Sequence, residues 1–200
     1  MGFIFKKNGE KSLQELGGAS PVLVFAIAWD NKAKGGILGK IVGIEHETDL
    51  DLSCAMYDGN GDRVDCVWYA QLRSKCGSIR HKGDDTVGTD VGDDELIIID
   101  LGQLEDEVKT LFFVISSFSG ENTLSTVEKA FWHVRDAQTR REIARYNFSG
   151  HDTASAKIVM RLQKTMDKGL PTWRIKALDE PATGKNIQEV FPEIRALIEG

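Results

Sequence analysis

The stretch Leu50-Asp-Leu-Ser-Cys-Ala-Met-Tyr57 carries an apolar residue or cysteine at every second position. Successive side chains of an extended chain point to opposite faces, so Leu50 and Leu52 share a face with Cys54 and Met56. This two-residue period predicts a half-buried β-strand. The motif Asp58-Gly-Asn-Gly-Asp62 follows at once and predicts a hairpin turn into the next strand.

The same period recurs along the chain and decides the expected fold class. It predicts further strands over residues 22–29, 64–69, 95–101, 110–117, 130–136, 141–148, 156–163 and 172–178. The segment Asp136-Ala-Gln-Thr-Arg140 supplies a turn between two of them. Many short strands at near-regular spacing are typical of an antiparallel two-sheet β-sandwich. We therefore expect a mainly β protein that forms a single domain over residues 1–200.

Two helices are expected beside the strands. The segment of residues 125–130 is expected to form a short helix. Near the C-terminus, apolar residues follow helical spacing at Ile187, Val190, Phe191, Ile194, Leu197 and Ile198. Pro192 interrupts that pattern, so a second turn could begin after Phe191.

Composition restricts the compartment and the partners. The longest apolar run, Val22–Trp29, has 8 residues, whereas a membrane-spanning helix needs about 20. The N-terminus does not resemble a secretory signal. Three cysteines (Cys54, Cys66 and Cys76) match no zinc spacing, which favours free thiols in a reducing compartment. These features predict a cytoplasmic protein.

The negative charge of the chain is concentrated in one segment. Lys and Arg number 25, and Asp and Glu number 31, for a net charge of -6. Residues 83–108 contain ten acids and no Lys or Arg: Asp84, Asp85, Asp90, Asp93, Asp94, Glu95, Asp100, Glu105, Asp106 and Glu107. Such a segment repels nucleic acid and attracts cations. We therefore expect no nucleic-acid partner.

Three other motifs do not satisfy the chemistry that they suggest. The glycine-rich residues 32–43 lack the residue order of a phosphate-binding loop and indicate a mobile loop instead. The Asp58–Asp62 motif resembles the start of an EF-hand, but Arg63 and Tyr69 stand where glycine and a bidentate glutamate are needed. None of the four histidines lies in a local nucleophile signature. We interpret each histidine as either solvated or packed, and His81, beside the acidic segment, could be a surface neighbour of it.

The clustered carboxylates are the strongest candidate site. Asp49 and Asp51 share one face of a strand because their positions differ by two. Asp84-Asp85 and Asp93-Asp94-Glu95 lie in a segment that contains Gly83, Gly88 and Gly92. Crowded carboxylates repel one another unless a cation is present, and Ca²⁺ takes six to eight oxygen ligands at about 2.3–2.6 Å. A solvated acidic loop is the alternative, and the charge pattern alone leaves both open.

Three motifs resemble the TerD family of bacterial tellurium-resistance and stress proteins. They are Leu72-x-Ser74-x-x-Gly77-Ser78-x-x-His81-x-Gly83-Asp84-Asp85, Gly92-Asp93-Asp94-Glu95-x-Ile97-x-Ile99-Asp100-Leu101, and Asp49-Leu-Asp51-Leu-Ser53. Together with weaker matches, the resemblance runs from about Val22 to Lys176. It implies a two-sheet β-sandwich with bound calcium and without an established enzymatic activity. The implied ligands of one or two calcium ions are Asp49, Asp51, Asp84, Asp85, Asp93, Asp94 and Glu95, with Asp30 a weaker candidate.

The resemblance and the charge pattern favour a calcium-binding stress-response or scaffold module that is not an enzyme and has other stress-response proteins as partners. Two alternatives stay open. One is a calcium-dependent membrane-surface module that uses Ile37, Leu38 and Lys40. The other is a hydrolase in which the same carboxylates bind Mg²⁺ or Mn²⁺ to activate water.

Overall fold

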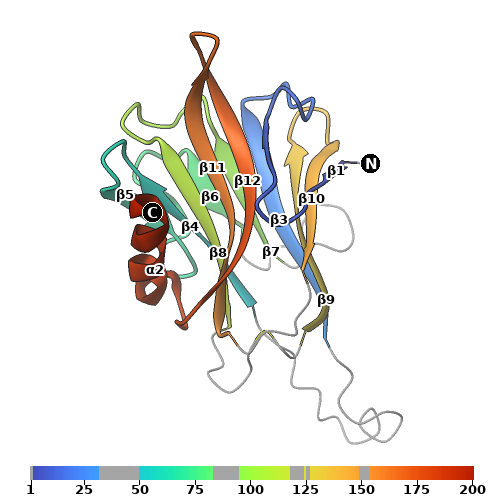
Figure 1. Cartoon of the computed structure of the whole chain (residues 1–200), viewed down its shortest axis with the longest axis vertical. Helices are drawn as coiled ribbons and strands as arrows, with labels where there is room; N and C mark the ends of the chain where they lie inside the picture. The colour runs from blue at the N-terminus through green and yellow to red at the C-terminus, as the bar shows by residue number, and fades with distance from the viewer. Residues whose placement is uncertain (1, 32–49, 83–94, 118–123, 125–126, 149–153) are drawn as a thin grey trace, which may run out of the picture.

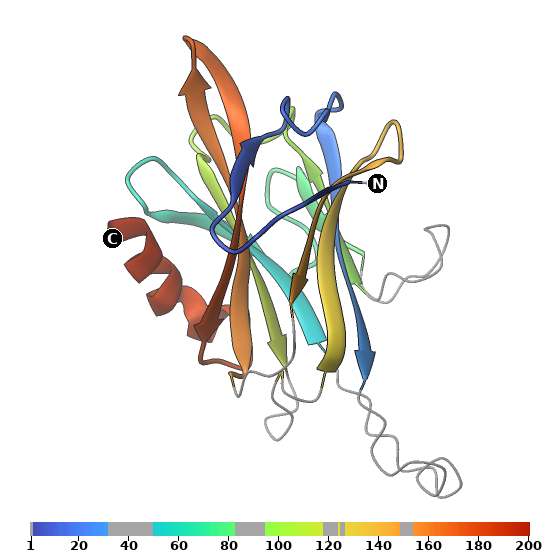
Figure 2. The same cartoon turned by 45° about the vertical axis from the view of Figure 1, so that its right-hand side comes forward.

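The computed structural model describes residues 2–31, 50–82, 95–117, 124, 127–148 and 154–200 of the chain. Sheet A consists, from edge to edge, of β1 (Phe3–Ile4), β10 (Glu142–Phe148), β9 (Val127–Asp136), β3 (Val22–Asn31), β7 (Glu95–Asp100) and β6 (Ile79–His81). Sheet B consists of β2 (Glu10–Ser12), β12 (Leu170–Ala182), β11 (Ala156–Asp167), β8 (Thr110–Ser117), β4 (Leu50–Tyr57) and β5 (Arg63–Val67). Neighbouring strands are antiparallel, except for the parallel pair β1–β10. The predicted two-sheet β-sandwich is confirmed (Figures 1 and 2).

The main core lies between the two sheets, where side chains from both meet. Phe25 of sheet A lies 4.5 Å from Phe113 of sheet B, measured between ring centroids, and 5.8 Å from Trp132. Leu52 belongs to the same core and has no exposed surface. Burial of such large apolar side chains stabilises the folded chain by about 1.5–3 kcal/mol each.

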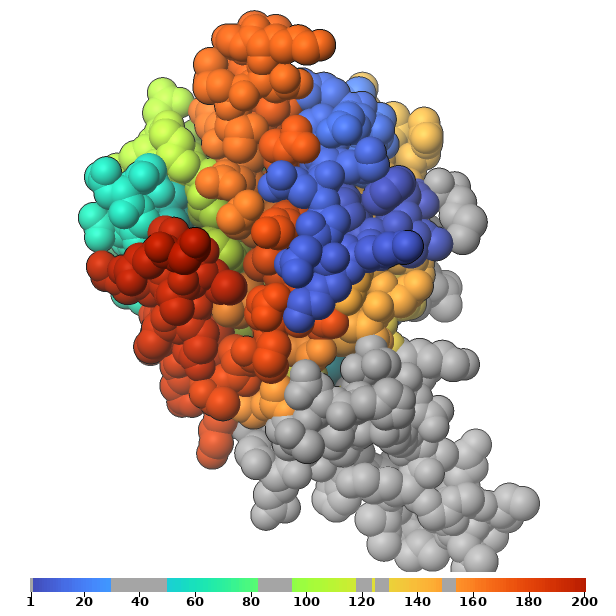
Figure 3. Space-filling view, in the orientation of Figure 1, coloured from blue at the N-terminus to red at the C-terminus, as the bar shows by residue number. Residues whose placement is uncertain are grey.

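A second, smaller core lies on the outer face of sheet B. Helix α2 (Ile187–Glu199) buries Ile187, Val190 and Ile194 there, beside Ala55 and Tyr57 of β4. Strand β4 is therefore covered on both faces, as is its neighbour β8, all of whose residues are buried. The space-filling view shows α2 beside β5 (Figure 3).

The C-terminal helix is confirmed, and Pro192 does not interrupt it. Asn186 caps the helix: its side-chain oxygen accepts hydrogen bonds from the backbone N–H groups of Gln188 and Glu189, at 2.9 and 3.3 Å. Pro192 lies inside α2 and removes one backbone hydrogen bond. The buried apolar face of the helix offsets that loss.

Each strand predicted from the two-residue period has a counterpart in the structure. The prediction of a short helix over residues 125–130 was wrong. Residues 127–130 belong to β9, and the register with β3 aligns Val127 with Asn31 and Ala130 with Trp29. Pairing with β3 in the sheet overrides the local helix propensity of this segment. Residues 125 and 126 lie outside the described part.

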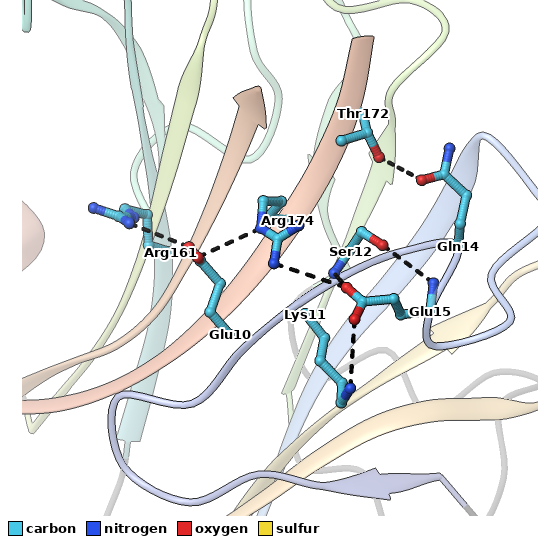
Figure 4. A network of polar contacts seen from close by, with 8 residues as sticks. All are labelled: Glu10, Lys11, Ser12, Gln14, Glu15, Arg161, Thr172 and Arg174. Carbon is cyan, nitrogen blue, oxygen red and sulfur yellow. Dashed lines mark hydrogen bonds and ion pairs between the residues drawn. The ribbon is translucent and has the colours of Figure 1, made fainter. Parts of the chain in front are cut away.

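The N-terminal segment is attached to sheet B by polar contacts (Figure 4). Glu10 forms ion pairs with Arg161 and Arg174, both at 3.4 Å. Ser12 and Glu15 bond reciprocally, each side chain accepting from the other's backbone N–H at 3.2 and 2.7 Å. Exposed ion pairs contribute about 0–1 kcal/mol each, so these contacts orient the segment more than they stabilise it.

Asp136 attaches the start of β3 to the β9–β10 turn. Its buried carboxylate accepts four backbone hydrogen bonds, at 3.0 and 2.8 Å from Ala19 and Ser20 and at 3.0 and 2.8 Å from Gln138 and Thr139. Burial raises the pKa of this carboxyl, but the hydrogen bonds outweigh burial and lower the pKa to about 2. The charged form is therefore the one that the fold stabilises.

We predict that Asp136→Asn lowers the free energy of unfolding by about 2–3 kcal/mol at pH 7, and by about half as much at pH 3. The folded-state pKa lies below that of the unfolded chain. The contribution is therefore complete above the unfolded pKa and is lost as pH falls through the folded one. Urea unfolding at both pH values measures this. Asp167→Asn, at the exposed tip of the β11–β12 hairpin, is the control. An equal loss at both pH values would contradict the assignment.

Candidate metal centre

Two of the seven predicted metal ligands, Asp51 and Glu95, lie in the described part of the chain. The predictions for Asp49, Asp84, Asp85, Asp93 and Asp94 lie outside the described residues, as does the side chain of Asp30. The described part thus includes the strand ends to which the acidic motifs are joined.

Asp51 is the second residue of β4 and is half-buried on the face of sheet B opposite Leu52. Its Cα partner on β8 is Ser116. The Ser116 hydroxyl is buried and has no hydrogen-bond partner among the described residues. Side chains of directly opposite residues have Cβ atoms about 4.5–5.5 Å apart, so a carboxylate and a hydroxyl come together at this point.

Glu95 is the first residue of β7 and is 8% exposed. Its carboxylate oxygen Oε2 accepts a hydrogen bond from the backbone N–H of Leu52, on the opposite sheet. This contact joins the 93–95 motif to the 49–51 motif, although 43 positions separate the two residues. Hydrogen bonds to a carboxylate in the protein interior are among the stronger hydrogen bonds in proteins.

His81, the last residue of β6, binds the same residue of β4. Its ring nitrogen Nε2 lies 2.9 Å from the carbonyl oxygen of Leu52 and 3.6 Å from Oε2 of Glu95. A carbonyl oxygen only accepts, so Nε2 carries the hydrogen and donates it. Of the two interpretations of His81, solvated or packed, the packed one is therefore correct, because the side chain is buried at 6% exposure and His81 is not a surface neighbour of the acidic segment.

An open strand edge explains why these two side chains meet at Leu52. Strand β5 pairs with β4 only over Cys54–Tyr57. Among the strands that the structure describes, none lies beside Leu52 on that side, and buried backbone N–H and C=O groups need partners. Glu95 and His81, both from sheet A, supply these partners and join the two sheets.

The described residues thus bring three separate motifs to one place. Leu52 follows Asp51 directly, Glu95 follows Asp94 directly, and His81 precedes Asp84 by three positions. His81 and the backbone of Leu52 were missed as site residues. The motif from Leu72 to Asp85, which contains His81, could have indicated this residue. The contact of His81 with β4, however, depends on long-range packing.

Within the described ranges, no group of three or more His, Cys, Asp or Glu side chains is arranged to hold a metal ion. The Asp58–Asp62 segment is a hairpin turn, as predicted: the Asp58 carboxylate accepts from the backbone N–H groups of Asn60 and Asp62, both at 2.8 Å. The three cysteines are free thiols, also as predicted, and Cys54 is fully buried.

The residues proposed for membrane contact (Ile37, Leu38 and Lys40) lie outside the described residues. Among the helices of the described part, none combines the length and apolar character needed to cross a bilayer.

Comparisons with known proteins identify the family of this chain. The family model described as TerD domain matches residues 1–191. Tellurium resistance protein TerZ of Serratia marcescens is 33% identical over 188 residues, covering 94% of each chain. Stress response protein SCP2 of Bacillus subtilis is 26% identical over 177 residues, covering 84% of this chain and 87% of that protein.

A crystal structure of a homologue of telluride resistance protein (TerD) from Streptomyces coelicolor A3(2) has a similar fold. Its TM-score is 0.62 at 16% identity, covering 85% of this chain and 95% of that one. At this identity the likeness concerns the fold alone. The family model and the TerZ match carry the assignment: this chain belongs to the TerD domain family of tellurium-resistance and stress-response proteins.

Proposed function

We propose that this protein is a calcium-binding module of the bacterial stress response that acts by binding partners and not by catalysis. The names of two relatives, a tellurium resistance protein and a stress response protein, support the cellular role. One observation supports the calcium site: Glu95 and His81 both bind Leu52, next to Asp51.

Chain connectivity limits how far the acidic motifs can lie from this point. An extended chain covers at most about 3.6 Å per residue. Asp94 and Asp51 directly precede Glu95 and Leu52, and Asp84 lies three positions after His81. By that measure, each motif begins within about 11 Å of Leu52, Glu95 or His81, the three residues that form what we call the Leu52 contact. Carboxylates confined in this way repel one another, and a divalent cation removes the repulsion.

The available donors fit calcium. Carboxylates and a hydroxyl are hard oxygen donors, and Ca²⁺ accepts six to eight of them in flexible geometry, whereas Mg²⁺ keeps several waters. The unpartnered, buried hydroxyl of Ser116 beside Asp51 is an oxygen atom that the described fold leaves unused. One or two ions would be held by carboxylates of Asp49, Asp51, Asp84, Asp85, Asp93 and Asp94, with the second oxygen of Glu95.

Bound calcium supplies positive charge that cancels the repulsion between the carboxylates. The residues of the chain do the rest. Glu95 and His81 keep the edge of β4 fixed, so that Asp51 is presented from a rigid strand. Ordering the acidic segment on this rigid base creates a surface that other stress-response proteins can bind.

We predict that calorimetric titration of the metal-stripped protein yields one or two calcium sites and that Mg²⁺ competes weakly. Because only the folded form holds the site, calcium at a hundredfold excess over its dissociation constant should raise the unfolding free energy by about 2.7 kcal/mol. Asp94→Asn should weaken binding, and the hairpin-tip variant Asp167→Asn should not. No binding heat, together with equal melting temperatures in calcium and EGTA, would refute the proposal.

Substitutions of Glu95 separate its two roles. Glu95→Gln keeps an acceptor for the Leu52 N–H and removes the charge, so stability in EGTA should stay close to wild type while calcium affinity falls. Glu95→Ala leaves that N–H unsatisfied and should cost about 1–3 kcal/mol in EGTA. Urea unfolding and calcium titration of both variants provide the measurements. If Glu95→Ala unfolds at the wild-type urea concentration in EGTA, the Leu52 contact does not support the fold.

A further inference from the structure

The connection from β5 to β6 carries an unusual share of positive charge. Residues 63–82 contain five Lys or Arg residues and one acid, in a chain of net charge -6. This segment passes from sheet B to sheet A at the edge where β5 and β6 are the last strands. Figure 1 shows β5 on the side of the molecule away from β1. Six exposed residues of the connection and of β6 with its following residue make up a surface that we name the edge surface: Tyr69, Leu72, Arg73, Lys75, Arg80 and Lys82.

The single acid of the segment does not neutralise these cations. Asp65 is buried, and its carboxylate accepts hydrogen bonds from the backbone N–H groups of Cys66 and Lys75 and from the side chain of Gln71. No carboxylate of the described residues forms an ion pair with the four cations of the edge surface. Elsewhere on the described surface, Arg161 and Lys164 do have carboxylate partners.

Two of the cations are held side by side on a rigid turn. Arg73 and Arg80 are partners in an antiparallel bridge. The bridge is enclosed by backbone hydrogen bonds from Ser74 to Ile79 and from His81 to Leu72, at 2.9 and 2.8 Å. Like charges directly opposite each other are unfavourable. A bound anion would relieve this repulsion.

The Arg73 side chain lies against Gly77, which has a φ of +77°. A Cβ at Gly77 would come within 2.7 Å of Nη2 of Arg73. The glycine therefore provides both the left-handed turn and the space that the guanidinium occupies. Arg73 is oriented before any partner arrives, which lowers the entropic cost of binding.

Apolar side chains accompany the charge. Leu72 is 50% exposed and Tyr69 is 41% exposed. The ring of Tyr69 contacts that of Trp68, with centroids 4.6 Å apart. A small anion would leave Leu72 and Tyr69 uncovered, whereas a peptide that carries both carboxylates and apolar side chains would cover them.

We propose that the edge surface is a docking site for an acidic, partly apolar peptide segment of another protein. The four cations have no ion pair with any carboxylate of the described residues, so their charge selects carboxylates. Leu72 and Tyr69 bind the apolar residues between those carboxylates. A nucleic acid fits less well. Residues 83–108, which follow Lys82, contain ten acidic residues and no Lys or Arg, and these acids would repel a long polyanion. The proposal does not require calcium, because no residue of the edge surface belongs to the candidate metal centre.

The test is fluorescence anisotropy of a labelled peptide, Glu-Glu-Phe-Glu-Glu-Leu-Glu-Glu, titrated with the full-length protein in EGTA. We expect saturable binding that weakens with salt, and a loss of affinity of about tenfold or more in Arg73→Glu/Arg80→Glu. The control Arg141→Glu/Lys168→Glu has the same net charge, carries its changes at two other exposed positions, and should bind like wild type. Leu72→Ser should weaken binding about threefold or more by removing an apolar contact.

Circular dichroism melting verifies the fold of each variant. If Arg73→Glu/Arg80→Glu does not fold, Arg73→Gln/Arg80→Gln, which removes both charges without reversing them, takes its place. Three results would overturn the proposal: no binding of the peptide, equal affinity of the edge and control variants, or tighter binding of an oligothymidylate than of the peptide.

Discussion

The structure depends on the need to satisfy the backbone of Leu52 at an open edge inside the sandwich. Strand β5 ends its pairing with β4 at Cys54, and the N–H and C=O of Leu52 are bonded instead by Glu95 and His81 of the opposite sheet. An unbonded pair of buried backbone groups would cost several kcal/mol, about 1–3 for each. Tyr146 and Asp179 form a second polar link between the sheets, at 2.9 Å, but this one joins side chains only.

The Leu52 contact also brings together residues that adjoin sequence motifs with no local relation. Each acidic motif is joined through the chain to a residue of this contact, so the contact limits how far apart the carboxylates of the proposed site can lie. The same fold separates the two signs of charge. The acidic motifs are joined to the contact inside one end of the sandwich, whereas the cations of residues 63–82 lie on its edge. The proposed calcium ions and the proposed acidic peptide would therefore be bound by different residues.

Much of the fold could be predicted because strands covered by a core repeat with a period of two, as in Leu50–Tyr57. The strands β1, β2 and β6 have only two or three residues, too few to show any period. Residues 127–130 were misassigned because their pairing partners lie about 100 positions earlier in the chain. The burial of His81 could not be predicted for a similar reason: the register of β6 against β7 and the approach of β4 are long-range properties. Charge alone placed the Glu95 and Asp51 motifs in one candidate site, but the contact between Glu95 and Leu52 could not be predicted, because it too depends on long-range packing.

The most direct test of this account is a crystal structure of the full chain grown in calcium, with an anomalous difference map recorded for the ion. The account predicts a calcium peak whose ligands include carboxylates from both the 49–51 and the 93–95 motifs, with Glu95 still accepting the N–H of Leu52. A map at saturating calcium without a peak between these two motifs would contradict it, as would a peak whose ligands all come from one motif.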